Sequence, residues 1–173
     1  MKRILITFAL CLITSIYSFA NYSISKRGIE HIKSHESCEL TAYWDSNGYS
    51  IGYGHHGKDV KKGMRISKSK AEQFLREDIK GAESAARRLI DNLPYKYKFS
   101  QGFFDGLVDM IYNCGEGAVK NSEFYNRLKR CRVKNGKMNI SDFDFTCASV
   151  KNFRTPQKGH KIRRAKTYKM MIG

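Results

Sequence analysis

Two carboxylates, Glu36 and Asp45, stand nine residues apart near the start of the chain. Apolar residues repeat with helical spacing from Ser25, an N-cap candidate, to about Ser37, so Glu36 is predicted in the last turn of a helix. The carbonyl end of a helix disfavours a further negative charge, and partial burial acts in the same direction. We therefore expect Glu36 to stay protonated near neutral pH and to act as a general acid.

Asp45 is expected in a different environment, at the junction of a strand and a turn. Residues 40–54 alternate as a strand does, and Asn47-Gly48 is typical of a hairpin because both residues tolerate positive φ. Asp45 should be wetter than Glu36 and remain ionised. Such a pair suits cleavage of a glycosidic bond, in which one group protonates the leaving oxygen and the other positions water or stabilises positive charge. Spacing alone, however, also fits two unrelated surface acids.

The sequence around the two carboxylates resembles the active-site segment of phage-type lysozymes, glycoside hydrolase family 24. It reads IKSHESCELTAYWDSNGYSIGYGHHG. In that family a helix carries the catalytic Glu, an Asp or Cys follows in the first hairpin, and a Thr precedes an Ile-Gly-x-Gly-His strand. The resemblance implies that Glu36, Asp45 and Ser50 are the catalytic residues. The chain has Ser50 in place of Thr, and four residues separate it from Asp45 where five are usual.

The resemblance also implies a fold and a substrate. The family fold has a small N-terminal sheet lobe and a larger helical lobe, with the glycan in the cleft between them. The expected reaction is hydrolysis of the β-1,4 bond between N-acetylmuramic acid and N-acetylglucosamine in bacterial peptidoglycan, usually with inversion. Asn113 is a candidate substrate contact in the cleft, or else a hydrogen-bonding residue at a helix end. The Arg163-Arg164 pair matches a family Arg-Arg pair.

The periodicity of the remaining chain predicts an α+β class with a mostly helical body. A long helix is predicted from Ser67 or Ser69, a buried one after Ser100, a third over 122–134 and a basic closing helix over 161–171. Residues 135–160 give no clear pattern.

The first twenty residues differ from the rest of the 173-residue chain. A basic start, an apolar run and small residues before Ala20 indicate a signal peptide over 1–20, or a membrane anchor if it is not cleaved, followed by one domain over 21–173. Loss of Lys2 and Arg3 lowers the formal charge from +16 to +14. We expect a monomeric periplasmic or secreted protein that meets an anionic envelope polymer, and no nucleic acid.

Other chemistry-bearing residues leave alternatives open. Export allows up to two disulfides or four reduced thiols among Cys38, Cys114, Cys131 and Cys147. No Cys or His spacing indicates a metal site, and the reaction needs no cofactor. We expect His55 to be structural and His56 to be exposed. Trp44 could stack on a sugar or join the core. Aromatics and lysines over 95–99 suit either a single-strand binder or a solvated link between helices.

Two other functions also remain open. A lytic transglycosylase would cleave the same bond without water, and a cationic envelope-binding protein would use the fold without catalysis.

Overall fold

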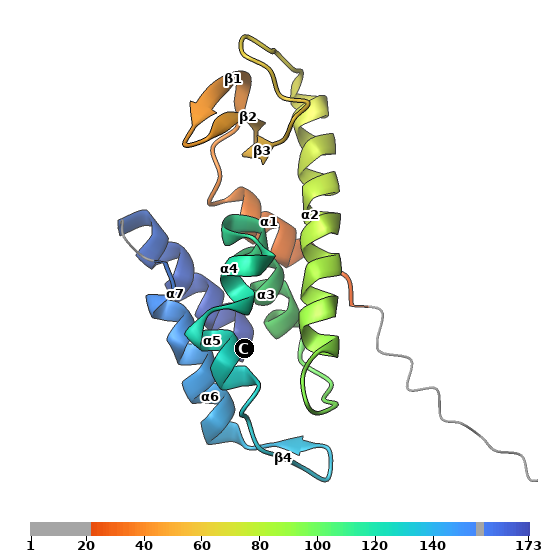
Figure 1. Cartoon of the computed structure of the whole chain (residues 1–173), viewed down its shortest axis with the longest axis vertical. Coiled ribbons are helices and arrows are strands. Elements are labelled where there is room, and N and C mark those ends of the chain that lie inside the picture. Colours follow the sequence, from red (N-terminus) through yellow and green to blue (C-terminus); the bar gives the residue numbers. More distant parts are fainter. Residues whose placement is uncertain (1–21, 155–157) are drawn as a thin grey trace, which may run out of the picture.

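A small sheet lobe and a larger helical lobe share one long helix, α2 (Lys68–Asp91). The computed structural model describes residues 22–154 and 158–173, so the expected leader at 1–20 lies outside it. Strands β1 (Glu39–Asp45), β2 (Gly48–Gly52) and β3 (His55–His56) form an antiparallel sheet in the order β1-β2-β3. Figure 1 shows this sheet beside the first half of α2 and the helical body beside the second half.

The helical body forms the larger lobe. Its elements are α1 (Lys26–Lys33), α3 (Gln101–Cys114), α4 (Glu116–Lys120), α5 (Glu123–Leu128), the hairpin β4 (Val133–Lys134) and β5 (Lys137–Met138), α6 (Ile140–Ala148), the 3-10 helix η1 (Ser149–Asn152) and α7 (Lys158–Ile172). The α+β class and the two-lobed arrangement predicted from the sequence are confirmed.

Serine side chains begin the main helices. The hydroxyl oxygens of Ser25, Ser67 and Ser100 accept a backbone N–H at the starts of α1, α2 and α3, and Ser122 does the same for α5. Each serine has extended backbone angles, as an N-cap requires. Of the two candidates for the start of α2, the structure therefore has Ser67.

Three sequence predictions need correction at element boundaries. Helix α1 ends at Lys33, well before Ser37, because the Ser34 hydroxyl donates to the His31 carbonyl at 2.8 Å and competes with further helix. Helical structure predicted over 122–134 stops at Leu128 and is followed by β4. In the first hairpin the positive φ falls on Ser46, at 54°, and not on Asn47 or Gly48.

The core centres on α3, against which α2 and α7 pack. Phe103, Phe104, Leu107 and Val108 are fully buried there, as the sequence predicted. The approach of α7 is so close that a Cβ on Gly102 would lie 2.1 Å from the carbonyl oxygen of Met170. A smaller cluster of Ile51, Val60 and Phe74 holds the sheet against α2. Helix α2 thus belongs to both lobes and fixes their spacing.

Several open alternatives are settled by packing. Trp44 is 63% exposed, with its ring edge-on to Tyr49 at 5.2 Å, so it is not a core residue. The 95–99 segment does link α2 and α3, but its aromatics are packed: Phe99 is buried and the Tyr95 hydroxyl donates to the Leu128 carbonyl at 2.6 Å.

Two further observations concern the cysteines and the membrane. The four cysteines of the described part, Cys38, Cys114, Cys131 and Cys147, are free thiols, so the structure contains none of the disulfides that remained open. Among residues 22–154 and 158–173, no helix combines the length and the apolar character that a membrane crossing demands.

Candidate active site

Glu36 lies in the short bend that connects α1 to β1, at the junction of the two lobes. Its Oε1 accepts a hydrogen bond from Nη1 of Arg163, which belongs to α7. Its Oε2 faces Gly54 at the end of the sheet, where an added Cβ would be 3.9 Å away. The Glu36 side chain retains 21% exposure, so the carboxyl group is largely buried but still open to a ligand.

Burial controls the protonation of Glu36. Desolvation raises the pKa of this carboxyl above its ordinary value, and the positive charge and hydrogen bond of Arg163 oppose that rise. The direction agrees with the sequence-based expectation, but the cause differs in part. Because α1 ends at Lys33, Glu36 lies beyond the last turn of that helix, and burial between the lobes supplies the main effect.

Asp45 lies at the end of β1, exposed to solvent beside the turn. Ser50, on β2, is fully buried, and its hydroxyl donates to Oδ2 of Asp45 at 3.4 Å. The two strands meet at the register pairs Asp45 with Gly48 and Tyr43 with Ser50, so the turn between them holds only Ser46 and Asn47. The shorter interval between Asp45 and Ser50 therefore still lets the hydroxyl reach the carboxylate.

His56 adds a contact that the sequence did not reveal. Its ring is exposed, as expected, but Nδ1 lies 3.1 Å from the Ser50 hydroxyl. The hydroxyl can therefore exchange hydrogen bonds with a carboxylate on one side and an imidazole on the other. The contact follows from the pairing of β2 with β3 in the structure, which places Ser50 opposite His56.

The Tyr43 hydroxyl feels the negative charges of both carboxylates, Glu36 and Asp45. The pKa of this hydroxyl is raised first by burial and then by the negative charges of Asp45 and Glu36. Coulomb interactions weaken with distance and with solvent screening, so both carboxylates lie within electrostatic reach of the same side chain. The structure thus places Tyr43 in the field of both Glu36 and Asp45, and the Ser50 hydroxyl in contact with Asp45.

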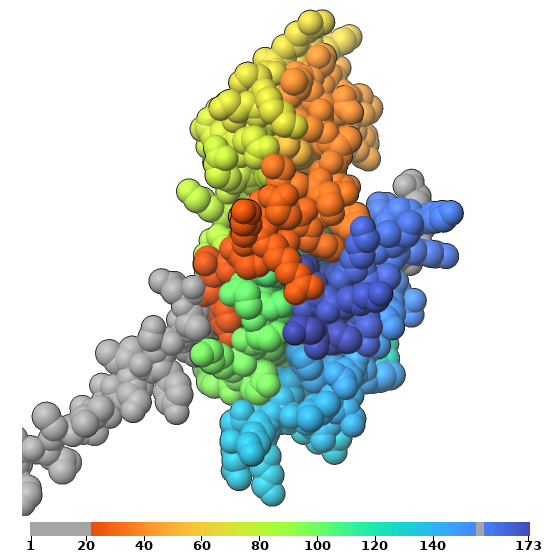
Figure 2. Space-filling model, turned by 180° about the vertical axis from the view of Figure 1, so that it is seen from behind, coloured from red at the N-terminus to blue at the C-terminus, as the bar shows by residue number. Residues whose placement is uncertain are grey.

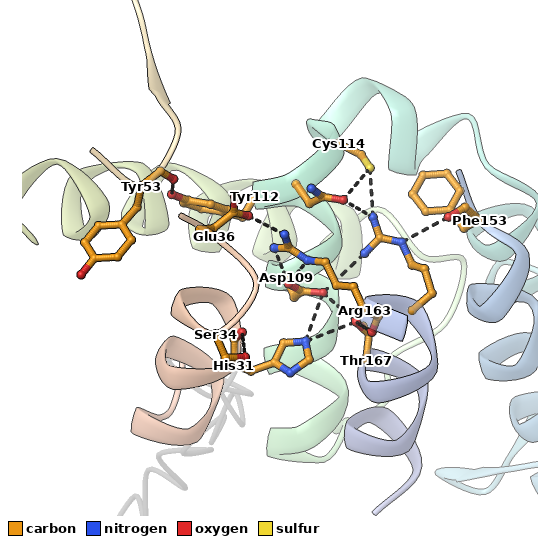
Figure 3. Close-up of polar contacts among 12 residues, drawn as sticks. His31, Ser34, Glu36, Tyr53, Asp109, Tyr112, Cys114, Phe153, Arg163 and Thr167 are labelled. Atoms are coloured by element: carbon orange, nitrogen blue, oxygen red, sulfur yellow. Dashed lines mark hydrogen bonds and ion pairs between the residues drawn. The ribbon is translucent and has the colours of Figure 1, made fainter. Parts of the chain in front are cut away.

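A buried ion cluster lies behind Glu36 (Figure 3). Nε and Nη2 of Arg163 donate to Oδ1 of Asp109 at 2.9 and 2.7 Å, while Nη1 reaches Glu36. Oδ2 of Asp109 accepts from the Thr167 hydroxyl at 2.7 Å and lies 3.5 Å from Nε2 of His31. Burial opposes ionisation of Asp109, but the hydrogen bond from His31 and the charge of Arg163 hold its pKa well below the usual range. Arg163 is therefore fixed by Asp109 and presented to Glu36.

Sequence reasoning noted Arg163 only through the family resemblance and missed Asp109. The available signal was a pair of aspartates, Asp105 and Asp109, one turn apart within an otherwise apolar helix. A buried carboxylate requires partners. Asp105 finds them in the backbone N–H and hydroxyl of Ser25, and Asp109 finds them in α7.

Asn113 lies at the C-terminal end of α3. Its Oδ1 accepts from Nη2 of Arg164, a fully buried residue that also donates to the Phe153 carbonyl at 3.2 Å. Its side-chain carbonyl is thus already used inside the protein, as the helix-end alternative anticipated, while contact with a substrate stays a prediction.

His55 has the structural role expected of it. Nδ1 lies 3.0 Å from the Asp78 carboxylate, Nε2 lies 3.1 Å from Asp59, and the ring stacks on Phe74 at 4.0 Å. Burial works against its protonated form, but the hydrogen bonds that the ring donates to Asp59 and Asp78 prevail and raise the pKa of His55. Across the described parts of the chain, no group of three or more His, Cys, Asp or Glu side chains is arranged to hold a metal ion.

Comparison with known proteins agrees with this geometry. The family model for phage lysozyme matches residues 33–166, a span that includes Glu36, the first hairpin, Asp109 and Arg163. The chain belongs to the phage lysozyme family. Within this family, the endolysin of Acyrthosiphon pisum secondary endosymbiont phage 1 is 32% identical over 144 residues, which cover 82% of this chain and 92% of that endolysin.

Other relatives are longer. The endolysin of Bacillus phage B103 is 40% identical over 109 residues, which are 61% of this chain but only 40% of that protein. The chain thus spans about two fifths of the length of this relative. Among solved structures, the endolysin of Escherichia coli O157:H7 phage FAHEc1 superposes with a TM-score of 0.65 at 31% identity, covering 87% of this chain and 93% of its own.

Proposed function

We propose that this phage lysozyme is a bacteriolytic peptidoglycan muramidase, which hydrolyses the β-1,4 bond between N-acetylmuramic acid and N-acetylglucosamine. Glu36 donates the proton to the leaving oxygen. Asp45, aided by Ser50, positions the attacking water or stabilises the positive charge that develops on the sugar. The observation that carries the proposal is the largely buried Glu36 at the lobe junction, with its raised pKa.

The electrostatics support different tasks for the two carboxylates. Glu36 is kept from water, so its neutral form persists to higher pH and can act as an acid. Asp45 is exposed at the turn and hydrogen-bonded by Ser50, an arrangement suited to a carboxylate that binds water. Two carboxyl groups in contrasting environments are the usual basis for dividing acid and base roles in glycoside cleavage.

The test is digestion of purified peptidoglycan by wild-type protein and by Glu36→Gln, with products identified by mass. Loss of the proton donor is expected to slow cleavage by about 10²–10⁴-fold. Glu77→Gln, an exposed glutamate on α2 that makes none of the contacts of Glu36, Asp45 or Ser50, removes the same charge and should leave cleavage unchanged.

Each outcome has a distinct meaning. Products that have gained one water support hydrolysis, whereas 1,6-anhydro ends would show a lytic transglycosylase. Undiminished lysis by Glu36→Gln would remove Glu36 from the acid role and favour a cationic envelope-binding protein that uses the fold without catalysis.

We further propose that the protein is exported through the inner membrane, with residues 1–20 as a signal peptide and 21–173 as the catalytic domain. Support comes from the basic start and apolar run of the sequence. The mass of the protein recovered from the periplasm or medium should correspond to a chain that starts at Asn21. A full-length mass in the membrane fraction would instead show an uncleaved anchor.

A further inference from the structure

A cationic trough lies between α1 and α7, on the face shown in Figure 2, where the two helices border one another. Its volume is about 430 Å³, within the range of small-ligand sites. Both helices pack on α3, and the trough occupies the space left between them. The residues that line it are set about one turn apart: Arg27, Glu30 and His31 on α1, Ser34 directly after its end, and Lys166, Lys169 and Met170 on α7.

The lining of the trough is mostly polar and charged. Met170 is its one apolar side chain, while the cations Arg27, Lys166 and Lys169 are exposed to solvent. Three of the lining residues are permanent cations, Arg27, Lys166 and Lys169, and one is a carboxylate, Glu30. In the described part of the chain, no ion pair joins those three cations to any carboxylate. The trough therefore carries positive charge that the protein does not neutralise.

The neighbouring His35 responds to this field. Burial lowers its pKa to about 4, and the positive charges of His31, Arg163 and Lys166 add to that effect. The charge of Lys166 therefore reaches His35, whose ring lies edge-on to the His31 ring at 4.8 Å.

We propose that the trough between α1 and α7 binds a phosphate group. A doubly charged tetrahedral anion matches the unpaired cations of Arg27, Lys166 and Lys169, and lysine and arginine both serve as phosphate ligands. The Ser34 hydroxyl and the His31 ring supply further polar groups in the lining. A carboxylate ligand, with one charge, would leave most of the positive field uncompensated.

The site is separate from the carboxylates assigned to glycan cleavage but connected to them through His31. The His31 ring lines the trough and also contacts Asp109, which holds Arg163 against Glu36. His31 is therefore a natural reporter for occupancy, because a phosphate in the trough must change the environment of its imidazole.

The experiment is a titration with inorganic phosphate at constant ionic strength, followed by NMR of the imidazole signals of the full domain. Wild-type protein should show a saturable shift at His31, and acetate should not reproduce it. Lys166→Gln combined with Lys169→Gln should weaken the response by about tenfold for each charge-assisted hydrogen bond removed. Lys158→Gln combined with Lys161→Gln removes the same charge from α7 outside the trough and should have no such effect.

A further variant is expected to have the opposite effect. Glu30→Gln removes the one carboxylate of the lining and should therefore tighten phosphate binding. The proposal is overturned if His31 shows no saturable shift, or if both double variants weaken it equally, since the effect would then be general ion screening. Glu36→Gln must keep the phosphate response, so failure of the muramidase proposal and failure of this one are distinguishable.

The same titration distinguishes two sources of the phosphate group. Glycerol phosphate and a poly(glycerol phosphate) are compared at equal phosphate concentration. Each phosphodiester of the polymer carries one charge, whereas the free monoester carries up to two. Tighter binding of the polymer therefore indicates an envelope polymer whose neighbouring phosphates act together, and equal or weaker binding of the polymer indicates a free phosphate monoester.

Discussion

Replacement of Arg163 by methionine is expected to be the most damaging single change near the active site. The Arg163 side chain is 4% exposed and Asp109 is completely buried, and two hydrogen bonds of 2.9 and 2.7 Å join them. In Arg163→Met, Asp109 keeps the Thr167 hydroxyl and the more distant Arg164 and His31, each at 3.5 Å, but loses its two shortest hydrogen bonds from a cation. Removing one partner of a buried ion pair costs about 3–5 kcal/mol. At about 2–4 °C per kcal/mol for a chain of this size, the melting temperature should fall by roughly 6–20 °C.

The assay is urea unfolding followed by far-UV circular dichroism, because the single tryptophan, Trp44, is exposed and a poor reporter of the core. The matched control is Arg88→Met. Arg88 pairs with Glu116 at 2.7 Å, but its side chain is 56% exposed, so its loss should cost about 0–1 kcal/mol. If Arg163→Met and Arg88→Met lower the free energy of unfolding equally, the buried cluster stabilises the fold no more than an exposed ion pair does.

Three further outcomes follow from particular contacts. Gly102→Ala should destabilise the protein by about 1–3 kcal/mol in urea unfolding, because its Cβ meets the Met170 carbonyl, whereas Gly81→Ala, with open space on α2, should stabilise it by about 0.5–1 kcal/mol. His55→Asn should lower stability by roughly 1.5–3 kcal/mol at pH 5.5 and less at pH 9. The raised pKa of His55 means that its contribution is present below the unfolded value and fades as the pH rises through the folded value. In peptidoglycan digestion, Ser50→Ala should lower the rate by about tenfold or more, while Ser50→Thr, which keeps the hydroxyl bonded to Asp45, should retain most activity.

Local chemistry made much of the fold predictable. Ser25 and Ser100 are good N-caps in their own right, and the apolar period of residues 101–113 is that of a buried helix. The alternation of residues 40–54 likewise indicated the first hairpin, while the pairing of Asp45 with Ser50 was expected only from the family resemblance.

Longer-range contacts were beyond the sequence signal. The bond between Glu36 and Arg163 joins residues 127 positions apart, and no local pattern encodes it. The region after residue 134 forms a hairpin and α6, with Ile140 and Phe145 exposed at 75% and 62%. Exposed apolar residues blur the helical period, so this segment gave no readable pattern.

The dependence of Glu36 on α7 has a consequence for biosynthesis. The cation that steadies Glu36 is made 127 residues later, so a nascent chain carries the glutamate long before it carries Arg163. Until α7 has been synthesised, the Glu36 carboxylate has no fixed counter-charge and Asp109 lacks its partner Arg163. The cluster therefore cannot assemble before Arg163 has been synthesised, and fragments released by premature termination before Arg163 cannot contain it.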